Sequence, residues 1–281
     1  MPKAAKATDH FPVVGVGASA GGLQAFRSFL QGLSATPGMA FILVQHLDPN
    51  HKSILRELLQ KSTSLPIKEI TDFTPIEQDN IYIIPSNKTL WVKDGMLRLD
   101  LRVKNNLKKN WLPINTFFES LAKEYTSRAI GIILSGTASD GTKGLKSIKN
   151  KGGITFAQDE NTAEWPEMPR SAVEAGVVDY ILAPQEMGKK IENLGSILSE
   201  EKNLKITTAT DEKQLYSEIL GILKKLMGTD FTHYKPTTIK RRISRRMGIN
   251  KVNSLKAYLE YLQENPLEQD VLYQALLIPV T

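Results

Sequence analysis

The stretch FPVVGVGASAGG, residues 11–22, decides the fold that this sequence predicts. Its first half, Phe11 to Val16, is almost wholly apolar, which is typical of a buried strand. From Gly21 to Leu33 the apolar side chains recur every three or four residues, the period of a helix that packs by one face. A strand, a glycine-rich turn and a helix in this order predict the start of a parallel α/β sheet.

The same alternation of strands and helices continues outward along the chain. Further strands are expected at Ala40–Val44, Ile81–Ile84, Ala129–Leu134, Ile154–Ala157 and Val178–Leu182, and helices at residues 53–61, 117–125 and 145–150. Asp94-Gly95, between Thr89–Val92 and Met96–Leu99, is a strong signal for a two-residue hairpin. We therefore expect a doubly wound α/β domain whose mostly parallel sheet is covered on both faces and carries an antiparallel hairpin.

The pattern changes after about residue 196. Residues 197–213 are polar and charged, and we interpret them as a linker or a connecting helix. From Leu215 onward the apolar residues keep the helical period only, which predicts a small all-α domain. The expected organisation is a tail at 1–10, an α/β domain at 11–196, the linker at 197–213 and a helical domain at 214–281.

The amino-acid composition limits the cellular compartment and the kinds of binding partner that are expected for this protein. The 281 residues include no cysteine, so disulfides and cysteine metal sites are excluded, and we expect a cytoplasmic protein. We find neither a secretory signal nor an apolar run that could span a bilayer, so membrane insertion is not expected. The formal net charge of +6 indicates an acidic partner, although nucleic acid, anionic lipid and an acidic protein surface all satisfy it.

Three strand ends carry residues of catalytic type: Ser19 in the first turn, His46 after the second strand and Asp140 after the strand at 129–134. Taken singly, the serine could cap a helix or line a phosphate loop, the histidine could be structural and the aspartate could be an N-cap. The carboxyl ends of parallel strands, however, share one edge of the sheet. Their joint placement predicts a nucleophile, a base and an orienting acid.

Cofactor chemistry is not predicted. The spacing of Gly15, Gly17, Gly21 and Gly22 departs from the dinucleotide fingerprint, and no phosphate-loop Gly-Lys-Ser is present. We therefore expect neither a nicotinamide nor a nucleoside triphosphate, and we assign no cofactor and no metal.

Several motifs resemble the catalytic domain of the CheB family. They are GASAGG, VQHLDPNHKS, IYIIPSNKTL, LSGTASDGTKGLKSIKNKGG and AQDENTAEWPEMPRSAVEAGVVD, which follow one another between about Phe11 and Leu194. The resemblance implies a methylesterase that removes methyl groups from receptor glutamates, releases methanol and in some members deamidates glutamine. It assigns the nucleophile, base and orienting acid to Ser19, His46 and Asp140.

The sequence departs from the family near the expected oxyanion site. Ala20 stands where threonine is common, Thr137 where methionine is common and Ala138 where glycine is common. The resemblance implies oxyanion donation by the main-chain N–H groups near Ala20 and Thr137. Because a main-chain donor survives a side-chain change, we expect an altered rate or selectivity. About ten residues precede the first strand, so the family's usual receiver domain is not expected.

The C-terminal part resembles the N-terminal helical domain of the CheR methyltransferases. The matching segments are FTHYKPTTIKRRISRRM (residues 231–247), SLKAYLEYLQENPLE and LLIPVT, and the transferase catalytic domain is not expected in this chain. Helical spacing pairs Arg241 with Arg245 and Arg242 with Arg246 on adjacent turns. This basic face could simply be solvated, or it could dock on acidic, glutamate-rich receptor helices.

Two other function classes were weighed. A non-catalytic signalling module that keeps the esterase fold predicts a damaged triad, and the intact Ser19, His46 and Asp140 count against it. A nucleic-acid binder would need a stacking motif that the basic segment lacks. Arg170 could meet an acidic substrate or serve at a helix N-terminus. The sequence thus predicts a cytoplasmic protein-glutamate methylesterase whose partners are the cytoplasmic helices of methylated chemotaxis receptors.

Overall fold

The computed structural model describes residues 11–46, 54–101, 112–200, 209–231, 234, 236–250, 252 and 254–277. The chain forms two compact units, one ending at Ser199 and the other beginning at Glu200. Each unit is described by itself. No described helix is both long enough and apolar enough to cross a bilayer.

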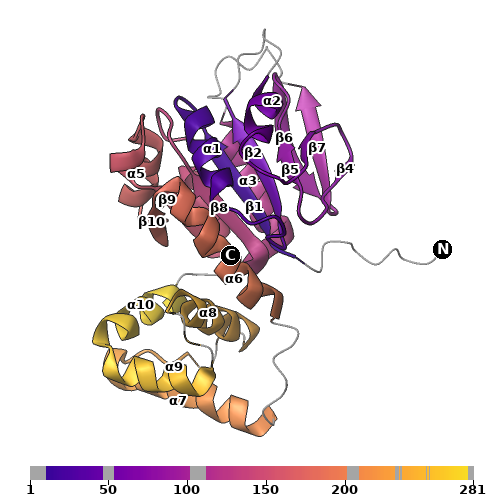
Figure 1. The fold of residues 1–281 in the computed structure, drawn as a ribbon. Coiled ribbons are helices and arrows are strands. Elements are labelled where there is room, and N and C mark those ends of the chain that lie inside the picture. Colours follow the sequence, from indigo (N-terminus) through magenta and orange to yellow (C-terminus); the bar gives the residue numbers. More distant parts are fainter. Residues whose placement is uncertain are drawn as a thin grey trace, which may run out of the picture. The chain divides into compact units, whose positions relative to one another are not determined.

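The first unit is built on a seven-stranded parallel sheet (Figure 1). The strands in chain order are β1 (Val13–Ala18), β2 (Ala40–Gln45), β3 (Ile67–Glu69), β5 (Ile81–Ile83), β8 (Ala129–Ile133), β9 (Ile154–Gln158) and β10 (Tyr180–Leu182). Their order across the sheet is β10-β9-β8-β1-β2-β5-β3. The chain therefore builds outward from β1 in one direction and returns to its other side at β8. This arrangement confirms the doubly wound α/β prediction and puts the switch point of the topology between β1 and β8.

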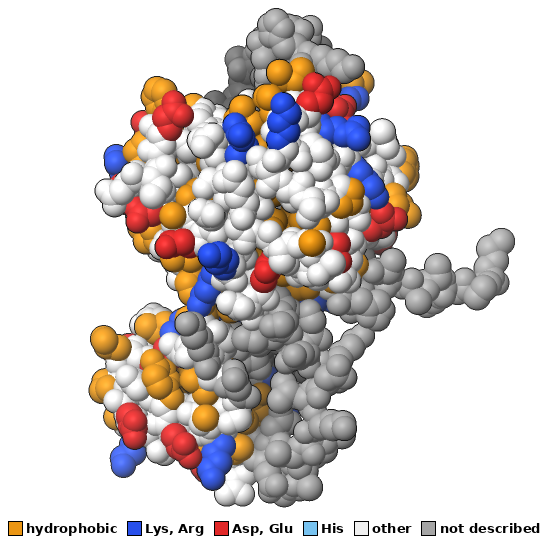
Figure 2. Space-filling model, viewed as in Figure 1, with side chains coloured by type: hydrophobic (Ala, Val, Ile, Leu, Met, Phe, Trp, Pro, Cys, Tyr) orange, Lys and Arg blue, Asp and Glu red, His pale blue; other side chains and the backbone are white. Residues whose placement is uncertain are grey.

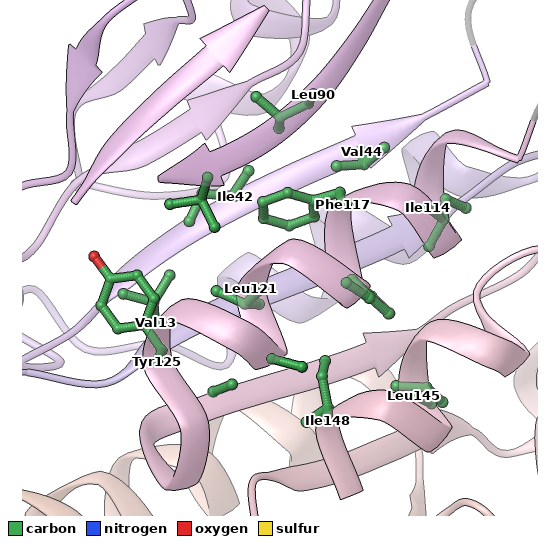
Figure 3. Packing of buried hydrophobic residues seen from close by; sticks show 14 of the residues in the cluster. Val13, Ile42, Val44, Leu90, Ile114, Phe117, Leu121, Tyr125, Leu145 and Ile148 are labelled. Carbon is green, nitrogen blue, oxygen red and sulfur yellow. The ribbon is translucent and has the colours of Figure 1, made fainter. Parts of the chain in front are cut away.

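Helices cover both faces of this sheet and seal two separate apolar layers. One layer contains residues of α3 (Pro113–Tyr125), α4 (Thr142–Asn150) and α5 (Glu167–Glu174). The other contains residues of α1 (Gly22–Gln31), α2 (Leu55–Gln60) and α6 (Pro184–Glu200). Figure 3 shows the first layer, where Phe117 and Leu121 of α3 lie against Ile42 and Val44 of the sheet. Burial on both faces explains why the strands are continuous apolar runs and do not alternate with polar residues.

Two glycines of β1 let α3 lie unusually close to the sheet. A Cβ atom on Gly15 would come within 2.8 Å of ring atoms of Phe117 and Phe118, and one on Gly17 within 2.5 Å of the Ile114 Cγ2 atom. Any side chain at these positions would push the helix away. The glycines therefore hold the N-terminal turn of α3 beside the carboxyl end of β1, where the candidate functional residues lie.

The predicted hairpin is confirmed. β6 (Lys88–Lys93) and β7 (Met96–Leu101) pair antiparallel, and β4 (Thr74–Pro75) extends them to a three-stranded sheet. Asp94 and Gly95 both have positive φ, 52° and 73°, as a type I′ turn requires. The Ser120 Oγ atom of α3 accepts a hydrogen bond from the Val92 N–H at 3.0 Å, so the hairpin is attached to the first apolar layer.

The second unit is helical, as predicted, with α7 (Ala209–Met227), α8 (Pro236–Ile249), α9 (Leu255–Glu264) and α10 (Pro266–Leu277). Its own core includes Ile219, Leu223, Ile243, Tyr258 and Leu272. The segment expected to be a linker or a connecting helix is helical at both ends. α6 continues to Glu200 and α7 begins at Ala209, which leaves residues 201–208 outside the described part. Glu, Lys and Gln are strong helix formers, so a polar segment can continue a helix.

Positive and negative side chains are intermixed on one face of the first unit. On the face of the first unit shown in Figure 2, Lys and Arg side chains are interspersed with Asp and Glu. The positive net charge is therefore not gathered into one basic patch on that face.

Candidate active site

The strand register brings Ser19 and His46 to the same level of the sheet. Ala18, the last residue of β1, pairs with Gln45, the last residue of β2, and the two functional residues come next in each strand. The Ser19 N–H donates to the Ser135 carbonyl oxygen at 3.0 Å, and the Gly22 N–H donates to the Ser19 carbonyl oxygen at 3.0 Å. The chain turns sharply here with Gly21 at φ 71° and enters α1. Ser19 therefore lies at a tight strand-to-helix turn.

His46 connects Ser19 to Asp140. The His46 Nδ1 atom lies 3.1 Å from the Ser19 Oγ atom, and its Nε2 atom lies 2.9 Å from the Asp140 Oδ2 atom. In serine proteases of the chymotrypsin type Nε2 faces the serine, so the two ring nitrogens have exchanged places here. A proton on Nε2, facing the Asp140 carboxylate, makes Nδ1 the acceptor for the serine proton. The carboxylate thus favours the tautomer that a general base needs.

Asp140 is held by the start of α3. Its side chain is 1% exposed. Oδ2 accepts the Ile114 N–H at 3.0 Å, while Oδ1 accepts the Asn115 N–H at 3.0 Å and the Gly141 N–H at 2.9 Å. The N-terminus of a helix stabilises negative charge, and three main-chain N–H groups donate to this carboxylate. The three hydrogen bonds fix the orientation of the carboxyl group behind His46.

A cavity of about 520 Å³ opens beside the serine. Its lining residues come from the turn and first helix, the end of β2 and one later loop: Ser19, Ala20, Gly21, Gly22, Leu23, Gln24, Gln45, His46 and Glu164. Glu164 is the one Asp or Glu among these nine residues, and no Lys or Arg is among them. The cavity is thus large enough for one side chain of a substrate and carries a negative charge at one wall.

The two expected oxyanion donors differ in their position. Ala20 lines the cavity, whereas Thr137 is exposed and does not belong to the lining. Neither of their N–H groups donates a hydrogen bond to another described residue. Ala138, next to Thr137, has a φ of 65°, a left-handed conformation that alanine adopts at a cost. Both N–H groups are thus available for an acceptor, and Ala20 lies nearer to the space that a substrate would occupy.

Ser135 is a supporting residue that sequence reasoning missed. Its Oγ atom donates to the Ala20 carbonyl oxygen at 2.9 Å and accepts the Trp165 N–H at 3.0 Å. It thereby connects the end of β8 to the Ser19 turn and to the loop that carries Glu164. The only sequence signal was its place between Leu134 and the small residues that follow, which is too common to be diagnostic.

Two of the four arginines expected to form a docking face make hydrogen bonds or an ion pair within the helical unit. Arg242 is 6% exposed, and its Nη1 atom donates to the carbonyl oxygens of Ala275 at 2.6 Å and Leu276 at 2.7 Å. Arg246 forms a two-point ion pair with Glu268, which also accepts the Tyr258 hydroxyl at 2.6 Å. Burial, and then the bond to Glu268, raise the pKa of the Tyr258 phenol.

These contacts correct the expectation of an exposed basic face at Arg242 and Arg246. α8 packs on α10, so the side chains that the sequence pattern assigned to solvent are covered by a neighbouring helix. Arg245 is half-buried, and the side chain of Arg241 lies outside the described part. Arg170 donates to Glu160 at 3.0 Å, and the Ser19 cavity does not include it. No group of described His, Asp and Glu residues is arranged to hold a metal ion.

The fold and the site define a class: a doubly wound α/β protein with a hydrogen-bonded Ser-His-Asp chain at the carboxyl edge of its sheet. The CheB methylesterase family matches residues 14–191, and the all-alpha domain of the CheR methyltransferases matches residues 214–277. The chain belongs to the CheB methylesterase family, with a CheR-type helical domain after it. This confirms both resemblances predicted from the motifs.

Individual relatives agree with this assignment. A putative protein-glutamate methylesterase/protein-glutamine glutaminase of Leptospira interrogans is 33% identical over 64% of this chain and 93% of its own length. The crystal structure of the Thermotoga maritima CheB methylesterase catalytic domain superposes with a TM-score of 0.60 at 29% identity, covering 66% of this chain and 98% of that one.

The likeness to one relative extends beyond the α/β domain. An uncharacterized 104.1 kDa protein of Rhodobacter capsulatus is 33% identical over 81% of this chain, which spans only 26% of that protein. The likeness therefore extends beyond the α/β domain, and this chain corresponds to a small share of that relative.

Proposed function

We propose that this chain is a serine esterase that removes methyl groups from glutamate side chains of chemotaxis receptors and releases methanol. The observation that carries the proposal is the position of His46, whose ring bridges the Ser19 Oγ atom at 3.1 Å and the Asp140 Oδ2 atom at 2.9 Å. The family and the names of the relatives support ester and glutamine side chains as substrates.

The reaction proceeds in two halves. His46 Nδ1 takes the Ser19 proton as Oγ attacks the ester carbonyl carbon, and the N–H groups of Ala20 and Thr137 stabilise the oxyanion. The intermediate collapses, the carbon–oxygen bond to the methoxy group breaks, and methanol leaves with the proton that His46 returns. Water, activated by the same nitrogen, then hydrolyses the acyl-enzyme to free glutamate. A glutamine side chain would follow the same course and release ammonia.

We extend the proposal to the receptor. The helical unit would contact receptor helices, since it matches the all-alpha domain of a methyltransferase family. Arg241 and Arg245 remain candidates for that contact, whereas Arg242 and Arg246 are engaged inside the unit. A substrate formed by the cytoplasmic helices of a receptor would place the enzyme in the cytoplasm.

The direct test is methanol release from a methylated receptor fragment by the wild type and by Ser19→Ala and His46→Ala. We expect turnover by the wild type and background rates for both variants, because either change removes a member of the proton-transfer chain. Circular dichroism of each variant checks that the fold is retained. A folded wild type that binds the receptor fragment but releases no methanol would contradict the proposal and favour a docking module.

A further inference from the structure

Ser135 contacts the Ser19 turn at two points. Its carbonyl oxygen accepts the Ser19 N–H at 3.0 Å, and its Oγ atom donates to the Ala20 carbonyl oxygen at 2.9 Å. The Ala20 N–H, the expected oxyanion donor, lies between these two points along the chain. The Ser19 carbonyl oxygen is held as well, because it accepts the Gly22 N–H at 3.0 Å. Since a peptide unit is planar, the Ala20 N–H cannot turn without moving at least one of these held groups.

The Ser135 hydroxyl also connects the turn to the loop on the other side of the cavity. Its one proton goes to the Ala20 carbonyl oxygen, since the Trp165 carbonyl oxygen is farther away, at 3.4 Å. The Oγ atom in turn accepts the Trp165 N–H at 3.0 Å. A Cβ atom on Gly21 would stand 2.6 Å from this Oγ atom and 3.0 Å from the Glu164 Cβ atom. The turn therefore packs directly on the hydroxyl and on the side chain of Glu164.

Ser135 itself does not reach a substrate. Its side chain is 1% exposed, and it is not among the residues that line the cavity. Its own N–H donates to the Gln158 Oε1 atom at 2.8 Å, which fixes its main chain at the end of β8. Any influence on the reaction must therefore pass through the turn that it holds.

We propose that Ser135 is a positioning residue for oxyanion stabilisation, its hydroxyl holding the Ala20 N–H in the orientation that the tetrahedral intermediate requires. This inference rests on the proposed serine hydrolase function. Preorganised donors stabilise a transition state because they need not reorient during the reaction. A displacement of about 1 Å can cost about 100-fold in rate. The effect belongs to the transition state, so it should lower kcat and leave binding of the substrate nearly unchanged.

The test uses Ser135→Ala and methanol release from a methylated receptor fragment. We expect kcat to fall by about 10- to 100-fold, with KM within about twofold of the wild type. An alkyl boronic acid, which forms a tetrahedral adduct with a nucleophilic serine, should bind more weakly by a similar factor. Its inhibition constant does not depend on the fraction of enzyme that is folded. The pH dependence of kcat should keep its wild-type shape, because the hydroxyl bonds to Ala20 and Trp165 and its loss leaves the His46–Asp140 pair in place.

Ser120→Ala is the matched control. The Ser120 Oγ atom also accepts one main-chain N–H, from Val92 at 3.0 Å, and donates to one main-chain carbonyl oxygen, of Phe117 at 2.8 Å. We expect urea unfolding to show a loss of stability in both serine variants, and kcat and the boronic acid inhibition constant to change only in Ser135→Ala. Should Ser135→Ala fail to fold, Ser135→Cys keeps a weak donor at the same place and should lower kcat by about 3-fold or more.

The outcomes separate this inference from the proposed function. A folded Ser135→Ala that keeps the wild-type kcat would overturn the inference and leave Ser135 as a structural support only. A fall in kcat with a displaced pH profile would also overturn it, because the change would then act through His46. In both cases the esterase proposal stands, whereas a wild type that releases no methanol would remove both.

Discussion

At the scale of single residues, the site depends on the hydrogen bonds that the Asp140 carboxyl group accepts. Three main-chain N–H groups, from Ile114, Asn115 and Gly141, surround a carboxylate that is 1% exposed. The remaining contact of Oδ2 is with His46. The same side chain therefore both contacts the His46 ring and holds the start of α3 against the loop after β8.

Asp140→Asn should affect both roles. We expect kcat for methanol release to fall by about 10⁴-fold, because an amide facing Nε2 favours the wrong tautomer of His46. We also expect unfolding free energy to drop by about 1–3 kcal/mol, since an NH₂ group would meet a main-chain N–H. Steady-state kinetics and urea unfolding measure the two effects. Asp100→Asn, an exposed change on β7, is the control and should alter neither; an active Asp140→Asn enzyme would refute the role of Asp140.

The charge of Glu164 should weaken binding of the product more than binding of the substrate. Its carboxylate lines the cavity in which the proposed reaction would turn a neutral ester into an anionic glutamate. In Glu164→Gln we expect inhibition by the demethylated product to strengthen by about 2- to 5-fold at low salt, and the difference to vanish near 1 M salt, as for an exposed charge. Inhibition assays at both salt concentrations measure it. Glu167→Gln, an exposed change on α5, should have no such effect, and an unchanged inhibition constant in Glu164→Gln would show that its charge does not reach the product.

At the scale of elements, the site depends on the closeness of α3 to β1. The helix supplies the two N–H groups that hold Asp140, and the strand ends at Ser19. Gly15 and Gly17 leave the space that the helix fills. The distance between Ser19 and Asp140 is therefore set by packing along the whole strand, and not only by the contacts of these two residues.

Gly17→Ala tests this packing. A Cβ atom 2.5 Å from the Ile114 Cγ2 atom must displace the first turn of α3. We expect unfolding free energy to fall by about 1–3 kcal/mol, and methanol release to slow because the donors to Asp140 move.

Ile114→Ala removes the helix side chain with which a Cβ atom at position 17 would clash. In an Ile114→Ala background the cost of Gly17→Ala should shrink, because the methyl group it meets is gone. Urea unfolding of the four variants measures this coupling. Strictly additive costs would mean that the two residues do not restrain each other.

At the scale of the whole molecule, the two units have separate apolar cores. Two clusters lie within residues 11–194, and a third lies within residues 215–277. The buried polar network of Arg246, Glu268 and Tyr258 belongs to the third. Stability and catalysis should therefore respond separately to changes in each unit.

Arg246→Met should destabilise the helical unit alone. Its ion pair with Glu268 is 14% and 4% exposed, and removal of one partner from a buried pair costs about 3–5 kcal/mol. In calorimetry we expect one thermal transition to move to lower temperature while the other stays in place. Hydrolysis of a small ester substrate at a temperature where both units are folded should keep its wild-type rate. A shift of both transitions would contradict separate cores.

The sequence by itself determined the local elements that carry the three candidate site residues. The glycine-rich turn, the apolar runs before His46 and before the Asp140 loop, and the Asp94-Gly95 turn are local signals. The rule that parallel strands share a carboxyl edge then brings three of these signals together. The structure agrees: Ser19, His46 and Asp140 lie within hydrogen-bond distance of each other in series. Their catalytic roles remain predictions.

Only the tertiary structure decided which other side chains face the cavity and which charges are covered. Gln45 and Glu164 are 119 positions apart, and no local pattern relates them. The short strands β3 and β4 and the helix α5 were not predicted either, since segments of two to eight residues carry little periodicity. Arg242 and Arg246 have the spacing of a solvated face, yet α10 covers them. Periodicity reports which face of an element is apolar, whereas burial of a polar residue depends on a partner supplied from elsewhere in the chain.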